Sequence, residues 1–223
     1  MKQCSALNDQ SDFVSLVDPR SAYHQAGRAA AIYLSNKQKR LPAVHFQISV
    51  KDQEEPAEQH LSRSKRLSQY RIKIEGGRLI QSLPLSYAET TQGLTITQQQ
   101  EYSSAFEADV INILVGPLAE AKYIALCDDE VFNANLVYLG ALKFYDGDKD
   151  IDIVNEYLEC MIVNQQERDR KLADLFLTAY GFINNRSNWQ AISILAQYIL
   201  DQSKGIIHCD EVITLLESSR MAA

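Results

Sequence analysis

Hydrophobic residues follow two different periods along this chain. Apolar and polar residues alternate in AVHFQISV at 43–50 and in YRIKIEGGRLIQSL at 70–83, and alternation predicts strands. The second stretch is expected to be a hairpin that turns at Gly76-Gly77 and returns through Leu79. Elsewhere the apolar positions recur every three to four residues, which predicts helices. The pattern therefore predicts a mainly α protein, a helical array with a small antiparallel β-sheet near the N-terminus.

Capping residues and helix breakers indicate where the expected helices begin and end. Asp18-Pro19 predicts the start of the first helix, because aspartate is a common N-cap and proline is tolerated at the first helical position. This helix should extend to residue 36 or 37. Thr95 to Thr97 is expected to cap a helix over 98–127 that Gly116-Pro117 bends or splits. Further helices are expected over 130–144, 149–163, 167–184 and about 185–200, with a short one from Asp210.

Length and composition place the chain among ordinary globular proteins. Its 223 residues suffice for one domain, expected over 18–223 after a polar tail at 1–17. The net charge of −7 argues against general nucleic-acid binding and against attraction to anionic membranes. Because no signal peptide or membrane span is evident, we expect a cytoplasmic protein. The four cysteines are scattered without metal-binding spacing, so we expect reduced, mostly buried thiols.

The stretch SAYHQAGRAAA at 21–31 carries the clearest chemical signal. Zinc peptidases of the H-E-x-x-H kind place two histidines one helical turn apart, with a glutamate beside the first. Here His24 is present, Gln25 stands at the glutamate position and Arg28 at the second histidine. Arginine has no lone pair to give a metal, and a glutamine amide is too weak a base to deprotonate water.

Three segments together resemble the FtsH-type zinc metallopeptidase domain. SAYHQAGRAAA is similar to the family's AYHEAGHA segment, and INILVGPLAEA at 111–121 is similar to its "laGraAE" helix, with Gly116, Ala119 and Glu120 in place. FYDGDKDIDIVNEYL at 144–158 resembles the turn that supplies the third zinc ligand, which would be Asp150 or Asp152. The C-terminal segments resemble the closing helices of small relatives that lack the ATPase.

The resemblance implies a zincin-related, FtsH protease-domain-like fold whose zinc site has changed. Zinc is the expected cofactor of the family, and we expect it to be lost here, leaving His24, Asp150 and Asp152 as vestigial ligand positions. We predict that Arg28 pairs with Asp150 or Asp152 and takes over the structural role of zinc, because a guanidinium can satisfy a buried carboxylate bidentately. The simpler alternative is that Arg28 is a surface residue.

Three functions stay open at this point. The first is a catalytically inactive metallopeptidase-like protein that binds a protein or peptide partner, with no nucleic acid and no membrane involved. The second is a weak or divergent metallohydrolase that uses His24 and Asp150. The third is a structural or assembly protein that acts through an interface, for which a homo-oligomer is possible.

The other candidate groups have simpler structural explanations. His45, His60 and His208 are expected on a strand, a loop and a turn, without partners at ligand spacing, and Asp210 is expected to be a helix N-cap. The acidic run that contains Asp146 and Asp148 lacks the glycine and glutamate of a calcium loop. The basic residues near 63–73 are expected to be solvated charges on a loop and an edge strand, and they comprise Arg63, Lys65, Arg66, Arg71 and Lys73.

Overall fold

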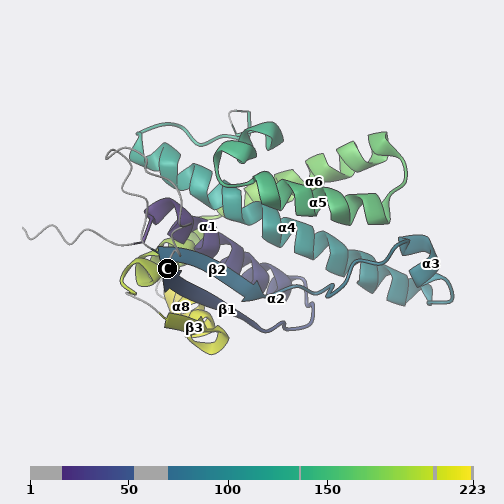
Figure 1. Ribbon diagram of the computed structural model, residues 1–223, viewed down its shortest axis with the longest axis horizontal. Helices are drawn as coiled ribbons and strands as arrows, with labels where there is room; N and C mark the ends of the chain where they lie inside the picture. Colours follow the sequence, from purple (N-terminus) through teal and green to yellow (C-terminus); the bar gives the residue numbers. More distant parts are fainter. Residues whose placement is uncertain (1–16, 53–69, 136, 203–204, 222–223) are drawn as a thin grey trace, which may run out of the picture.

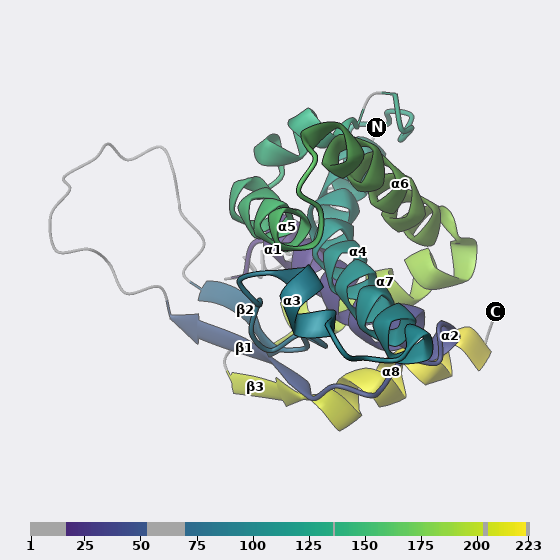
Figure 2. The same cartoon turned by 90° about the vertical axis from the view of Figure 1, so that its right-hand side faces the viewer.

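The helices of this protein surround one long central helix, and a small sheet packs beside them (Figures 1 and 2). The structure is a computed structural model that describes residues 17–52, 70–135, 137–202 and 205–221. The described part of the chain is mainly helical, with one three-stranded antiparallel sheet. In chain order the elements are α1 (Pro19–Ala30), η1 (Ala31–Ser35), α2 (Asn36–Gln38), β1 (Phe46–Asp52), β2 (Tyr70–Gly76), α3 (Tyr87–Thr91), α4 (Ile96–Cys127), η2 (Leu139–Phe144), α5 (Asp148–Met161), α6 (Gln165–Asn184), α7 (Arg186–Leu200), β3 (Gly205–His208) and α8 (Cys209–Met221).

Helix α1 begins where the sequence predicts and packs closely on α4. The Asp18 side chain caps it by accepting a hydrogen bond from the Arg20 backbone N–H at 3.1 Å, and Pro19 occupies the first turn. The helix continues through a π-helical turn, η1, which the sequence analysis did not predict, and through α2. A Cβ added to Gly27 would lie 2.5 Å from the Cβ of Ala119, so glycine is required for this approach of α1 to α4.

The sheet has the strand order β2-β1-β3, which corrects two predictions. Strand β2 pairs with β1 and does not form a hairpin with the residues that follow, because Gly76 and Gly77 have φ of 84° and 81° and lead the chain away from the sheet. Strand β3 comes from near the C-terminus, and it places His208 on a strand, where a turn was expected. The sheet is thus built from both ends of the chain. Its charged residues Arg71 and Lys73 are exposed on edge strand β2, as expected.

Helix α4 is the central element of the core. Thr95 and Gln98 form a capping box at its start, and the helix runs without interruption to Cys127, so Pro117 does not split it. The helix is long and apolar enough to cross a membrane by length and composition, but 72% of its most apolar window is buried inside the structure. Contacts with the surrounding helices therefore account for its apolar character.

Several local predictions in the second half of the chain are wrong. The helix expected over 130–144 is reduced to the 3-10 helix η2, since the Asn133 side chain accepts the Asn135 backbone N–H at 2.9 Å and stabilises a turn instead. Asp210 lies within the first turn of α8 and is not its N-cap, because α8 begins at Cys209. Among the described cysteines, Cys127 is exposed, and Cys160 and Cys209 are half-buried, so burial of these thiols was over-predicted.

Some predictions fall on residues outside the described ranges. They concern Cys4 and the tail at 1–16, and the loop residues His60, Arg63, Lys65 and Arg66. The packed part of the chain starts one residue before the expected boundary at 18, because Val17 is only 2% exposed and belongs to the core.

Candidate functional site: a buried chain of alternating charges

Three cationic residues form a stripe along α1. Arg20, His24 and Arg28 recur every four residues, and this spacing places them on one face of a helix. Their side chains meet two carboxylates from other elements: Glu120 near the end of α4 and Asp150 in the first turn of α5. The site thus joins three helices that are distant in sequence.

The five side chains contact one another in an alternating order. The two ring nitrogens of His24 face the two carboxylates, with Nδ1 3.2 Å from Glu120 Oε2 and Nε2 2.9 Å from Asp150 Oδ2. At one end Arg20 donates two hydrogen bonds to Glu120 Oε1, from Nε at 2.9 Å and from Nη2 at 2.7 Å. At the other end the Nη1 of Arg28 donates to Asp150 Oδ1 at 3.3 Å. We call this set, Arg20–Glu120–His24–Asp150–Arg28, the charge chain.

The inner members of the charge chain are excluded from water. His24, Glu120 and Asp150 are exposed by only 4%, 2% and 6%. The outer members differ, because the side chain of Arg28 is 16% exposed and that of Arg20 is 48% exposed. Buried charges are costly unless they are paired and hydrogen-bonded. Here each carboxylate lies between two cationic groups, so removing one partner would leave a buried charge without compensation.

The charge chain determines the protonation state of His24. Burial on its own would lower the pKa of the imidazole, but the hydrogen bonds and charges of Asp150 and Glu120 outweigh burial and raise this pKa to about 9. His24 is therefore an imidazolium at neutral pH, and both of its ring nitrogens donate. Burial lowers the pKa of Arg28, and the negative charge of Asp150 opposes this lowering. The hydrogen bond to Glu120 raises the pKa of Arg20.

The surrounding backbone is shaped to hold the His24 ring. Gly116 of α4 lies against it, and a Cβ added there would be 2.7 Å from His24 Nε2.

A second buried polar cluster fixes α5 relative to α4. Asp109 accepts the backbone N–H groups of Leu79 and Ile80, each at 2.9 Å, and the Tyr157 hydroxyl at 3.1 Å. Burial raises the pKa of Asp109, and the three donors oppose that rise. Together these contacts orient the helices that bear the charge chain.

The structure brings together some of the predicted site residues and not others. It pairs Arg28 with Asp150, the first of its two predicted partners, so the reading of Arg28 as a surface residue is wrong. Asp152 is exposed and lies outside the charge chain. Gln25 is half-buried, and its side chain makes no hydrogen bond within the described ranges. Arg20 also belongs to the charge chain; it was not among the predicted site residues, although its spacing of four from His24 was a usable signal.

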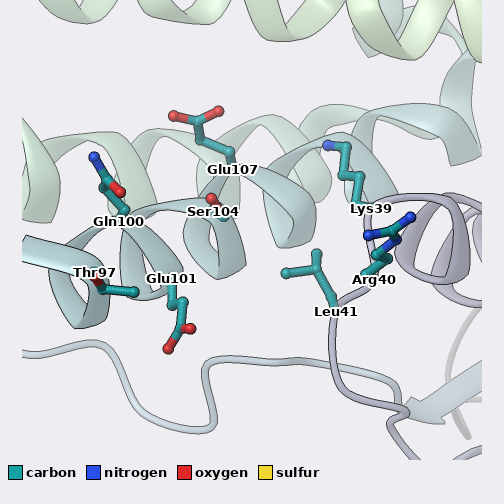
Figure 3. Close-up of a pocket in the computed structure, with 8 residues that line it drawn as sticks. All are labelled: Lys39, Arg40, Leu41, Thr97, Gln100, Glu101, Ser104 and Glu107. Carbon is teal, nitrogen blue, oxygen red and sulfur yellow. The ribbon is translucent and has the colours of Figure 1, made fainter.

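Open pockets lie elsewhere on the molecule. One of about 450 Å³ lies between the turn after α2 and the first turns of α4, and Figure 3 shows its lining. Its walls carry both signs of charge: Lys39 and Arg40 stand on one side, and Glu101 and Glu107 on α4. Two smaller pockets are also lined by residues outside the charge chain. The charge chain is thus a buried junction between helices.

Comparison of this chain with protein-family models, with curated proteins and with solved structures found no match. Its interpretation therefore depends on its own residues and their geometry.

Proposed function

We propose that this protein is a catalytically inactive, metallopeptidase-like protein that works by binding a protein or peptide partner. Its fold would be zincin-related, of the FtsH protease-domain type. The convergence of three segments supports this relationship. His24, Glu120 and Asp150 come from the segments that resemble the family, in the family's order, and they meet at hydrogen-bonding distance although Glu120 and Asp150 lie 96 and 126 residues from His24.

The donor set at this junction does not suit a zinc ion. Catalytic zinc usually has three protein ligands with free lone pairs, and histidine must be neutral to ligate. Among the described residues, His24 is the only imidazole at this junction, and it is held protonated between two carboxylates. The position of the second histidine bears Arg28, whose cation lies 3.3 Å from the candidate ligand Asp150. A dication placed there would meet two resident cations.

The residues for activating water are also changed. The glutamate that serves as general base in H-E-x-x-H peptidases is replaced by Gln25, which cannot accept a proton at neutral pH. Glu120 and Asp150 are carboxylates, but both are buried and engaged by cations. The observation that carries the proposal is therefore the Arg28–Asp150 ion pair beside an imidazolium at His24.

A protein that works by binding a partner needs a contact site on its surface. The pocket in Figure 3 is the candidate contact, because Lys39, Arg40 and Glu101 make no ion pair with any other described residue. Charges of both signs that are not satisfied internally can pair with a polar protein or peptide segment.

The test measures zinc content and peptidase activity in the same preparation. The protein is purified without chelator, its zinc is determined by mass spectrometry, and hydrolysis of unfolded casein is followed beside a His24→Ala variant. We expect substoichiometric zinc and casein hydrolysis at background for both proteins. Stoichiometric zinc in the natural protein, lost together with a peptidase activity in His24→Ala, would instead establish the divergent metallohydrolase.

A further inference from the structure

We infer that Arg28 is a built-in replacement for a divalent cation, so that the junction of α1 with α5 is held by a side-chain charge and needs no metal. The inference rests on the proposed relationship to metallopeptidases, but it concerns stability and not activity. It also identifies what stands where a third ligand would be needed: Arg28, whose guanidinium donates to Asp150 and offers a metal no lone pair.

The groups that surround His24 support this inference. Its Nδ1 is directed at Glu120, and metal-ligating histidines usually direct their second ring nitrogen at a carboxylate in this way. Its Nε2 is directed at Asp150, 2.9 Å away. The second oxygen of Asp150 is contacted by Arg28. His24 and Asp150 are therefore two potential ligands, and Glu120 orients the imidazole. Arg28 supplies a positive charge beside Asp150.

The two arginines at the ends of the charge chain allow a matched comparison. Arg28 contacts Asp150, whereas Arg20 contacts Glu120 on the opposite side of the imidazole. In Arg28→His, the new imidazole would stand one helical turn from His24 and beside Asp150, which completes three ligand groups. In Arg20→His, the cation at Arg28 is unchanged. Only the first substitution should make the protein bind zinc.

The experiment follows thermal unfolding by circular dichroism for the natural protein and for Arg28→His, Arg28→Lys and Arg20→His, each in chelator and with added zinc. Binding of Co²⁺ is followed by its visible absorption. Added zinc should not change the unfolding temperature of the natural protein, of Arg28→Lys or of Arg20→His. Zinc at about 100 times its Kd stabilises a folded protein by about 2.7 kcal/mol, which for a domain of this size raises the Tm of Arg28→His by roughly 5–10 °C.

The possible outcomes separate this inference from the proposed function. If Arg28→His is unfolded in chelator and folds when zinc is added, the inference is supported as strongly as by a shift in Tm. If Arg28→His stays metal-free, or unfolded with zinc present, the inference is overturned, while a zinc-free and inactive natural protein still agrees with the proposed function. If the natural protein itself loses stability in chelator, Arg28 does not replace a metal.

Discussion

The buried imidazole of His24 should make the stability of this protein depend on pH. In the unfolded chain His24 titrates near its ordinary pKa of 6.5, and in the folded protein near 9. Because the folded pKa is the higher one, the stabilisation is fully present below pH 6.5 and is lost as the pH rises through 9. The difference between the two pKa values, at about 1.4 kcal/mol per unit, amounts to roughly 3 kcal/mol.

The groups that face His24 explain the size of this effect. Glu120 of α4 and Asp150 of α5 both accept from the imidazolium, and Arg20 and Arg28 lie beyond them on the same face of α1. When the imidazolium loses its proton, one of its two hydrogen bonds to the carboxylates is lost. Both buried carboxylates are then left with one cationic partner each, Arg20 for Glu120 and Arg28 for Asp150, which is the costly state.

The assay is urea unfolding between pH 6 and pH 9.5, performed on the natural protein and on His24→Gln. Subtracting the two curves removes the contribution of other titrating groups, and we expect the difference in free energy of unfolding to shrink by about 3 kcal/mol across this range. NMR titration of the His24 ring, assigned by its absence in His24→Gln, gives the folded pKa directly. Parallel stability curves, or a ring that titrates at or below pH 6.5, would refute the reasoning.

Two further substitutions test the surroundings of the charge chain. Gly116→Ala should destabilise the protein by about 2 kcal/mol, because the new methyl group would collide with the His24 ring, whereas Gly181→Ala, where an added Cβ meets nothing within 4 Å, should stabilise it by about 0.5–1 kcal/mol; similar Tm values for the two variants would count against the packing described. Asp109→Ala should cost about 3 kcal/mol in urea unfolding, since it removes the acceptor shared by the Leu79 and Ile80 backbone N–H groups and the Tyr157 hydroxyl, and Tyr157→Phe about 1 kcal/mol. A smaller loss for Asp109→Ala than for Tyr157→Phe would contradict that assignment.

The sequence predicted the helices that have strong boundary signals. Asp18-Pro19 and Thr95 each precede a helix as expected, because a cap is a local interaction that neighbouring residues alone determine. The long helix α4 was expected to bend or split at Gly116-Pro117, and it is not split. Dense packing on every side of α4 evidently outweighs the hydrogen bond that proline removes.

Non-local contacts were the main source of error. Strand β3 is a four-residue apolar segment near the C-terminus, and its pairing with β1 leaves no local signal. The choice of Asp150 over Asp152 follows from which face of α5 meets α1, and it could not be decided from the sequence. The pairing of Glu120 with Arg20 spans 100 residues and was likewise not predicted.

The coupling between Arg28 and Asp150 tests the central claim most directly. A double-mutant cycle of Arg28→Ala, Asp150→Ala and the double variant, measured by urea unfolding both with and without excess chelator, isolates the interaction of the two side chains. We predict a coupling free energy of about 1–3 kcal/mol that is the same with and without chelator. A coupling within about 0.5 kcal/mol of zero, or one that disappears in chelator, would show that this ion pair does not hold α1 to α5.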